Sequence, residues 1–204
     1  MTKSVFAIAL NHKSQMQHWH DAFLQDPYKK LPVKQVWFIK PRNTYNVSGG
    51  TINLTGPETY YSGATLALII GKKASKIKSS EYTKYLKGIA LANEISLEES
   101  SFYRPAIKAK CQDGSCPIGS IRDLKDIRHI TLNTYINDTL VQSDSTDDLI
   151  LDAGAILESL TDFATLQEND VVLVGTSHKR VAIKPLDKIE IKACGFETLV
   201  TYAK

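Results

Sequence analysis

The sequence predicts a strand-rich α+β protein with about three helices at its periphery. Short runs of β-branched and other apolar residues recur along the chain and become frequent in its C-terminal part. Apolar residues at helical spacing occur in only a few stretches. Strands and helices follow one another in mixed order, which argues against a doubly wound parallel sheet, because that fold requires regular alternation.

The predicted strands are short and apolar. They cover residues 5–10, 36–40, 66–70, 90–96, 130–138, 171–176, 181–184, 188–193 and 198–202. Residues 130–138 alternate most clearly and end in the turn pair Asn137-Asp138. Pro41 closes the strand at 36–40, since proline cannot donate to a strand ladder.

Three segments carry helical signals. Ser14 and Gln17 form a possible capping box for a helix that Asp26-Pro27 would end. Ser79 or Ser80 can cap a second helix, whose apolar positions continue to residue 89. The apolar positions of residues 149–160 repeat at helical spacing and predict the third.

The composition is that of an ordinary globular chain. A length of 204 residues suits a single domain, residues 1–204, and 43% of the residues are hydrophobic. The net charge of +3 is too small to indicate nucleic-acid binding. The apolar run at residues 5–10 is too short for a signal segment or a membrane span, so a cytoplasmic protein is expected. Cys111, Cys116 and Cys194 do not complete a zinc set and are interpreted as reduced thiols.

Several short blocks of sequence are similar to one known family. They are residues 9–11, 38–44, 66–77, 90–96, 108–119, 145–150, 163–176 and 184–191. In order and spacing they resemble the fumarylacetoacetate hydrolase family over nearly the whole chain. Some members fuse two homologous domains, and this chain looks like the N-terminal one. The resemblance implies a β-rich roll that acts on 2-oxo acids.

The resemblance also implies a metal position. Family members bind Mg²⁺ or Mn²⁺ with three carboxylates, two of them in an E-x-E pair on a strand, where positions i and i+2 face one side. Here Gly63 and Thr65 match that pair, and only the third position keeps an acid, Glu94. One carboxylate is a poor cage for a divalent ion. The metal of the family is therefore not expected with its usual ligands in this chain.

At the family's other functional positions, this chain has a different residue in some places and the same residue in others. A catalytic His and Glu on an N-terminal lid correspond to Gln15 and His18, so the usual acid–base pair is missing. Lys110 matches the active-site lysine, which would favour an anionic substrate or enolate; an ordinary surface lysine is the alternative. Thr176 matches a threonine of a substrate-binding turn; the alternative is a strand-end hydroxyl.

Two further positions concern a second carboxylate of the substrate. Tyr103 and Arg104 could bind it, because arginine holds carboxylates bidentately, although a structural salt bridge of Arg104 is the alternative. Residues 178–180 are interpreted as a solvated basic loop.

The resemblance leaves three functions open. The first is a subunit that decarboxylates 5-carboxymethyl-2-oxohex-3-ene-1,7-dioate or isomerises 2-hydroxyhepta-2,4-diene-1,7-dioate in 4-hydroxyphenylacetate catabolism. The second is a non-catalytic partner of a homologous metal-binding chain. The third is an acylpyruvate-type hydrolase, which the missing acid–base pair disfavours. The expected partners are a small 2-oxo dicarboxylate and a homologous second subunit or further copies of the chain, without nucleic acid or membrane.

Overall fold

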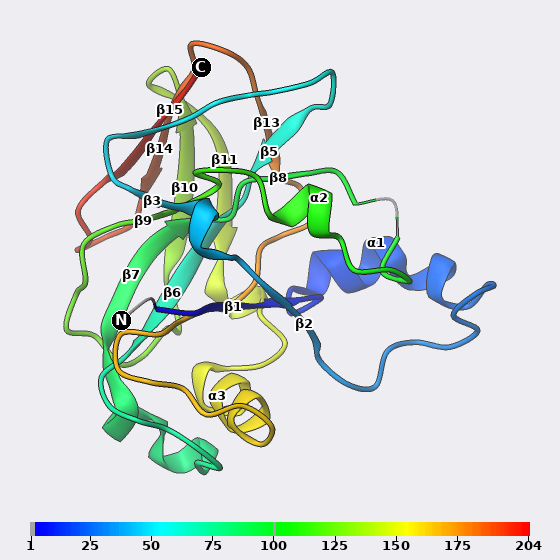
Figure 1. Cartoon of the computed structure of the whole chain (residues 1–204), viewed down its shortest axis with the longest axis vertical. Coiled ribbons are helices and arrows are strands. Elements are labelled where there is room, and N and C mark those ends of the chain that lie inside the picture. Colours follow the sequence, from blue (N-terminus) through cyan, green and yellow to red (C-terminus); the bar gives the residue numbers. More distant parts are fainter. Residues whose placement is uncertain (1–2, 100) are drawn as a thin grey trace.

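The computed structural model of the chain describes residues 3–99 and 101–204. Figure 1 shows curled sheets with the longer helices outside them, and this arrangement confirms the predicted strand-rich α+β class. In the described residues, no helix has the length and apolar character that a membrane span would need.

The largest sheet has the strand order β2-β1-β12-β6-β7-β9-β3. These strands are β1 (Val5–Ala9), β2 (Val36–Ile39), β3 (Tyr45–Val47), β6 (Ala64–Ile70), β7 (Leu86–Asn93), β9 (Cys116–Ile118) and β12 (Val171–Leu173). The antiparallel pair β6–β7 lies at its centre, and all residues of β6 are buried. A strand covered on both faces reads as a continuous apolar run, which is why residues 66–70 were recognisable.

Two smaller sheets complete the roll, with orders β11-β10-β14-β15-β4 and β13-β5-β8. The first contains β4 (Gly50–Ile52), β10 (Thr131–Ile136), β11 (Thr139–Ser145), β14 (Lys188–Lys192) and β15 (Leu199–Ala203). The second contains β5 (Tyr60–Ser62), β8 (Ser96–Leu97) and β13 (Val181–Ile183). β4, β5 and β8 were not predicted, because strands of two or three residues carry too little periodicity to be recognised. β11 has seven residues but was also missed, because it is largely exposed and its sequence is mostly polar.

The helices are α1 (Lys13–Phe23), α2 (Ile107–Lys110) and α3 (Ala153–Thr161), with 3₁₀ turns η1 (Arg42–Thr44), η2 (Ser79–Tyr85) and η3 (Thr146–Asp148). The predicted capping box is wrong: His12 caps α1, and its Nδ1 accepts from the Ser14 amide. The helix predicted from residue 79 to 89 is a 3₁₀ turn that ends where β7 begins. The third helix is confirmed, although it begins only at Ala153, after the cap Asp152.

The core lies on both faces of the β6–β7 pair. Leu66, Leu68 and Ile70 point toward α3 and the second sheet, where Ile156 and Ile191 belong to the same apolar cluster. Ala67, Ile69, Ala90 and Ala92 form the opposite face with residues of β1 and β12. This packing fixes β6 and β7, and the positions predicted to be functional lie where these two strands end.

Candidate functional site

The three positions that match the family's metal ligands come together at one end of the β6–β7 pair. Ala64 pairs with Asn93 in the register of the two strands, and the Glu94 amide donates to the Gly63 carbonyl at 2.8 Å. Gly63 and Glu94 are therefore neighbours across the strand pair, and Thr65 and Glu94 line the same small hollow. What the sequence did not show is how the side chains around them are engaged.

Neither of the two replaced positions offers space or a free ligand. A Cβ atom on Gly63 would lie 2.9 Å from the Thr176 methyl carbon and 3.1 Å from the Glu94 carbonyl oxygen. Thr65 is fully buried, and its hydroxyl donates to the Gly175 carbonyl at 2.6 Å. A carboxylate at residue 63 would therefore require its neighbours to move.

Glu94 is buried and bound by two ammonium groups. Its Oε1 atom lies 3.1 Å from Lys40 Nζ, and its Oε2 atom lies 2.7 Å from Lys110 Nζ. Burial would raise the pKa of Glu94, but the charges of Lys110, Lys40 and Arg180 outweigh burial and lower the pKa to about 2. Glu94 is therefore a carboxylate at neutral pH, and both of its oxygens are engaged.

Lys40 and Glu99 contact the predicted site residues but were not predicted from the sequence. Lys40 is only 1% exposed, and its ammonium donates to Glu94 Oε1, to the Ile95 carbonyl at 2.9 Å and to Ser115 Oγ at 2.9 Å. An ammonium has three donors, and here all three are used. Lys40 directly follows β2 and precedes Pro41 within one of the family-like blocks, but a lysine in that place carries no signal of burial.

Lys110, the predicted catalytic residue, lies at the end of α2 and is buried. It forms ion pairs with both Glu94 and Glu99, and Glu99 also pairs with Arg180. The interpretation of residues 178–180 as a solvated loop is wrong for Arg180, whose side chain is 11% exposed, and holds only for Lys179. Lys40, Glu94, Lys110, Glu99 and Arg180 together form a continuous network, called the central ion network below.

The remaining predicted positions surround this network. Thr176 is buried, with its methyl carbon near the place where a Gly63 side chain would begin. Gln15 uses its side-chain oxygen to accept from the Leu10 amide at 2.8 Å. The ring of His18 stacks on that of His178, with 3.5 Å between their centroids. The pKa of His178 is lowered, first by burial and then by the charge of His18.

The space left at the centre is very small. A hollow of about 10 Å³ remains, which is roughly the room that one water molecule needs. Its lining includes Gln15, Thr65, Glu94, Lys110 and Thr176. The positions that the family resemblance assigns to substrate and metal therefore meet, but around almost no free volume.

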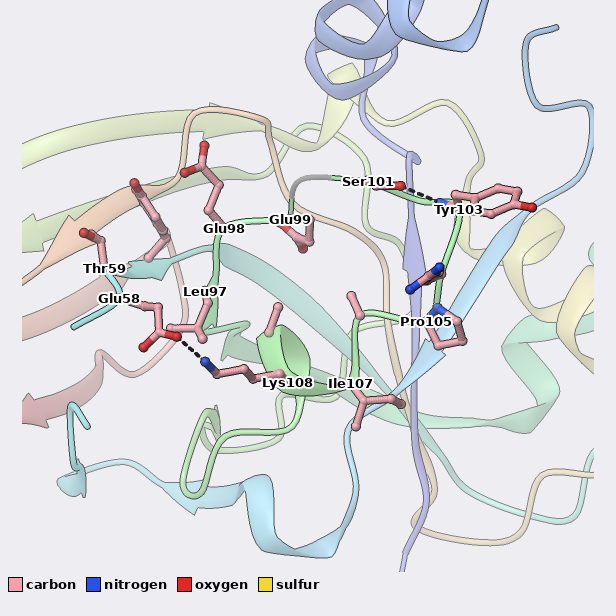
Figure 2. A pocket seen from close by; sticks show the side chains of 14 residues that line it. Glu58, Thr59, Leu97, Glu98, Glu99, Ser101, Tyr103, Pro105, Ile107 and Lys108 are labelled. Atoms are coloured by element: carbon pink, nitrogen blue, oxygen red, sulfur yellow. Dashed lines mark hydrogen bonds and ion pairs between the residues drawn. The ribbon is translucent and has the colours of Figure 1, made fainter. Parts of the chain in front are cut away.

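Larger cavities lie outside the central ion network. One of about 440 Å³ has mainly apolar walls that include Trp37, Phe38 and Phe102, and it reaches Lys110. A second, of about 670 Å³, is lined by more polar residues, among them Lys108 and Glu58, whose ion pair is drawn in Figure 2. The two share the segment that carries the predicted substrate-binding residues.

Tyr103 and Arg104 lie on that shared segment. Tyr103 is 63% exposed, and Figure 2 shows it on the outer side of the second cavity. Within residues 3–99 and 101–204, Arg104 makes no ion pair, so the alternative of a structural salt bridge finds no support there. The segment is held against α1, because the Phe102 amide donates to Tyr28 Oη at 2.7 Å and the Phe102 ring packs on Trp19.

Residues 4–202 match the family described as fumarylacetoacetate (FAA) hydrolase C-terminal. The chain belongs to this family. It is 47% identical to the 4-hydroxyphenylacetate degradation bifunctional isomerase/decarboxylase of Escherichia coli, over 98% of this chain and 46% of that protein. The chain thus spans about half the length of this relative. The match lies in the C-terminal half of this relative. The expected correspondence with an N-terminal domain is therefore not confirmed.

Solved structures show the same fold. The 5-carboxymethyl-2-hydroxymuconate delta-isomerase of Mycobacterium smegmatis superposes with a TM-score of 0.84 at 23% identity, over 99% of this chain and 78% of that one. The fumarylpyruvate hydrolase of Pseudomonas aeruginosa, in complex with Mn²⁺ and pyruvate, gives 0.82 at 20% identity, over 99% and 89%. At these identities the likeness establishes the fold alone.

The residues present in this chain do not fit a divalent cation of the kind that the fumarylpyruvate hydrolase holds. Of the three ligand positions, one has no side chain, one holds its hydroxyl against a carbonyl, and the third is bound by Lys40 and Lys110. Across the described parts of the chain, no group of three His, Cys, Asp or Glu side chains is placed to hold a metal ion.

Proposed function

We propose that the chain is a subunit of an enzyme that acts on 2-oxo dicarboxylates in 4-hydroxyphenylacetate catabolism. The reactions would be the decarboxylation of 5-carboxymethyl-2-oxohex-3-ene-1,7-dioate and the isomerisation of 2-hydroxyhepta-2,4-diene-1,7-dioate. The identity with the Escherichia coli isomerase/decarboxylase along nearly the whole chain carries this proposal. Because the chain spans about half of that relative, we further propose that it functions as one domain, residues 1–204, in the cytoplasm beside a homologous subunit.

The cavity of about 440 Å³ is the best place for such a substrate. Its volume lies in the range of small-molecule sites, and its walls combine apolar side chains with the cationic Arg104 and Lys110 and the anionic Glu99. Arg104 at the rim would hold a carboxylate with its planar fork, as guanidinium groups do. Lys110 at the inner end adds positive potential, although its direct partners are Glu94 and Glu99.

The test is a rate measurement with and without a homologous chain that carries an intact E-x-E pair. The purified chain is assayed on both substrates alone, then after co-expression with that partner. We expect little activity alone and a higher rate for the pair than for the partner. Arg104→Gln should reduce the added rate by raising KM. An unchanged partner rate, together with no substrate binding by the chain, would contradict the proposal.

A second candidate is a non-catalytic partner, which the saturated carboxylate of Glu94 and the hollow of about 10 Å³ favour. Such a chain would stabilise its homologous partner without binding substrate. In the same assay the pair would again be faster than the partner alone, but Arg104→Gln would leave the rate and KM of the pair unchanged. The response to this one variant therefore separates the two candidates.

A further inference from the structure

We propose that the buried ammonium of Lys40, together with Lys110, takes the place of a divalent cation as the fixed positive charge at the centre of this fold. The chain would then bind no metal ion at this place. The inference does not depend on the substrate of the enzyme, because it concerns the counter-charge of Glu94 alone.

The first argument is saturation of Glu94, which is the one carboxylate at the three positions that match the family's metal ligands. Glu99, the other carboxylate at the hollow, is already paired with Lys110 and Arg180. Each oxygen of Glu94 has its own ammonium partner, Lys40 on Oε1 and Lys110 on Oε2. A metal ion at Glu94 would have to displace one of them. If Lys40 were displaced, its ammonium would stay buried without a counter-charge, which is strongly unfavourable, whereas Lys110 would keep only its pair with Glu99.

The second argument is that the Lys40 ammonium cannot move away without losing its buried hydrogen-bond partners. The Lys40 side chain is fully buried, and its other two donors are held by the Ile95 carbonyl and Ser115 Oγ. Ser115 directly precedes β9 and Ile95 lies between β7 and β8, and both residues are fully buried. The ammonium is therefore a built-in part of the fold, as a structural metal ion would be.

The third argument is the number of ligands and the room for them. Mg²⁺ keeps several water molecules when few protein ligands are offered, and Mn²⁺ likewise prefers a set of oxygen ligands. The hollow has space for about one water molecule, and residues 63 and 65 contribute no carboxylate. Lys40, Lys110 and Arg180 face only Glu94 and Glu99 in the network, so the surplus charge is positive and repels a cation.

The test is a titration of the full chain with Mn²⁺, followed by electron paramagnetic resonance, in which the signal of free Mn²⁺ falls when the ion is bound. We expect no loss of signal, and the same unfolding midpoint in Mn²⁺ and in chelator. One bound Mn²⁺ per chain that disappears in Glu94→Gln would overturn the proposal. Bound Mn²⁺ that persists in Glu94→Gln would lie elsewhere, and the proposal would stand.

A double-mutant cycle tests whether Lys40 is the counter-charge of Glu94. Urea unfolding is measured for Lys40→Met, Glu94→Gln and the double variant. We expect the unfolding free energy of the double variant to fall by much less than the sum of the two single decreases, because removing both charges leaves neither Lys40 nor Glu94 as an unpaired buried charge. Additive losses would overturn the proposal. Ser115→Ala removes one acceptor of Lys40 and is a milder variant should a single change prevent folding: it should destabilise the wild type but have no effect on Lys40→Met.

Discussion

The centre of the candidate site and the cavity of about 440 Å³ that borders it, called the outer pocket below, differ in how their charged residues are held. At the centre, Lys40 and Glu94 are at most 2% exposed, and their contacts come from buried residues next to strand ends and from Lys110 of α2. In the outer pocket, Arg104 is exposed and Tyr103 is 63% exposed, on a segment held by contacts with Tyr28 and Trp19. We propose that the centre stabilises the fold and that the outer pocket recognises a ligand.

The largest effect is expected from breaking the centre. Glu94→Gln leaves Lys40 and Lys110 without their shared counter-charge in a buried place. Loss of one partner of a buried ion pair costs about 3–5 kcal/mol of unfolding free energy. Chemical denaturation of the wild type and the variant measures the difference. Glu81→Gln is the matched control, since Glu81 pairs with Lys84 on the surface, and it should have no measurable effect. Equal stability of Glu94→Gln and wild type would contradict the view that the network supports the fold.

The same comparison predicts how stability depends on pH. The folded pKa of Glu94 is about 2, below its ordinary value of 4.5. A lowered pKa means that the stabilisation is fully present above pH 4.5 and is lost as the pH falls toward 2. Unfolding midpoints measured from neutral to acidic pH should fall most steeply in that window. In Glu94→Gln this part of the decline should be missing; an unchanged profile would contradict the assignment.

A smaller effect is expected at Thr65, beside the network. Thr65→Val removes the hydroxyl that donates to the Gly175 carbonyl and leaves that acceptor unpaired, at a cost of about 1–3 kcal/mol. Thr65→Ser keeps the hydroxyl and is the matched control, with a smaller loss from the missing methyl group. Thermal unfolding of both variants checks the prediction. If Thr65→Ser were as damaged as Thr65→Val, packing rather than the hydrogen bond would explain the position.

The two regions also differ in how far the sequence could predict them. The long apolar strands and the third helix follow from local patterns. The proximity of Gly63 to Glu94 was expected from the family resemblance alone. The ion network does not follow from local patterns, because Lys40, Lys110 and Arg180 come from distant parts of the chain and a buried lysine has the same sequence appearance as an exposed one. Family resemblance supplied Lys110 and the loss of two carboxylates. Only the tertiary contacts show that a second cation, Lys40, neutralises the remaining carboxylate, Glu94.

The smallest effect on stability belongs to the outer pocket, where the largest effect on binding is expected if the proposed function is correct. Arg104→Gln should leave the unfolding free energy within about 0.5 kcal/mol of wild type, because the residue is exposed and makes no ion pair among the described residues. It should weaken binding of the 2-oxo dicarboxylate about tenfold, which corresponds to about 1.4 kcal/mol for a lost charged hydrogen bond. Calorimetric titration measures this, with Lys73→Gln as a control for loss of one positive charge outside both cavities. Arg104→Lys keeps the charge but not the bidentate geometry, so an affinity between those of wild type and Arg104→Gln is expected. Unchanged binding in Arg104→Gln, or an equal loss in Lys73→Gln, would remove Arg104 from the recognition of the substrate and leave the outer pocket without its proposed role.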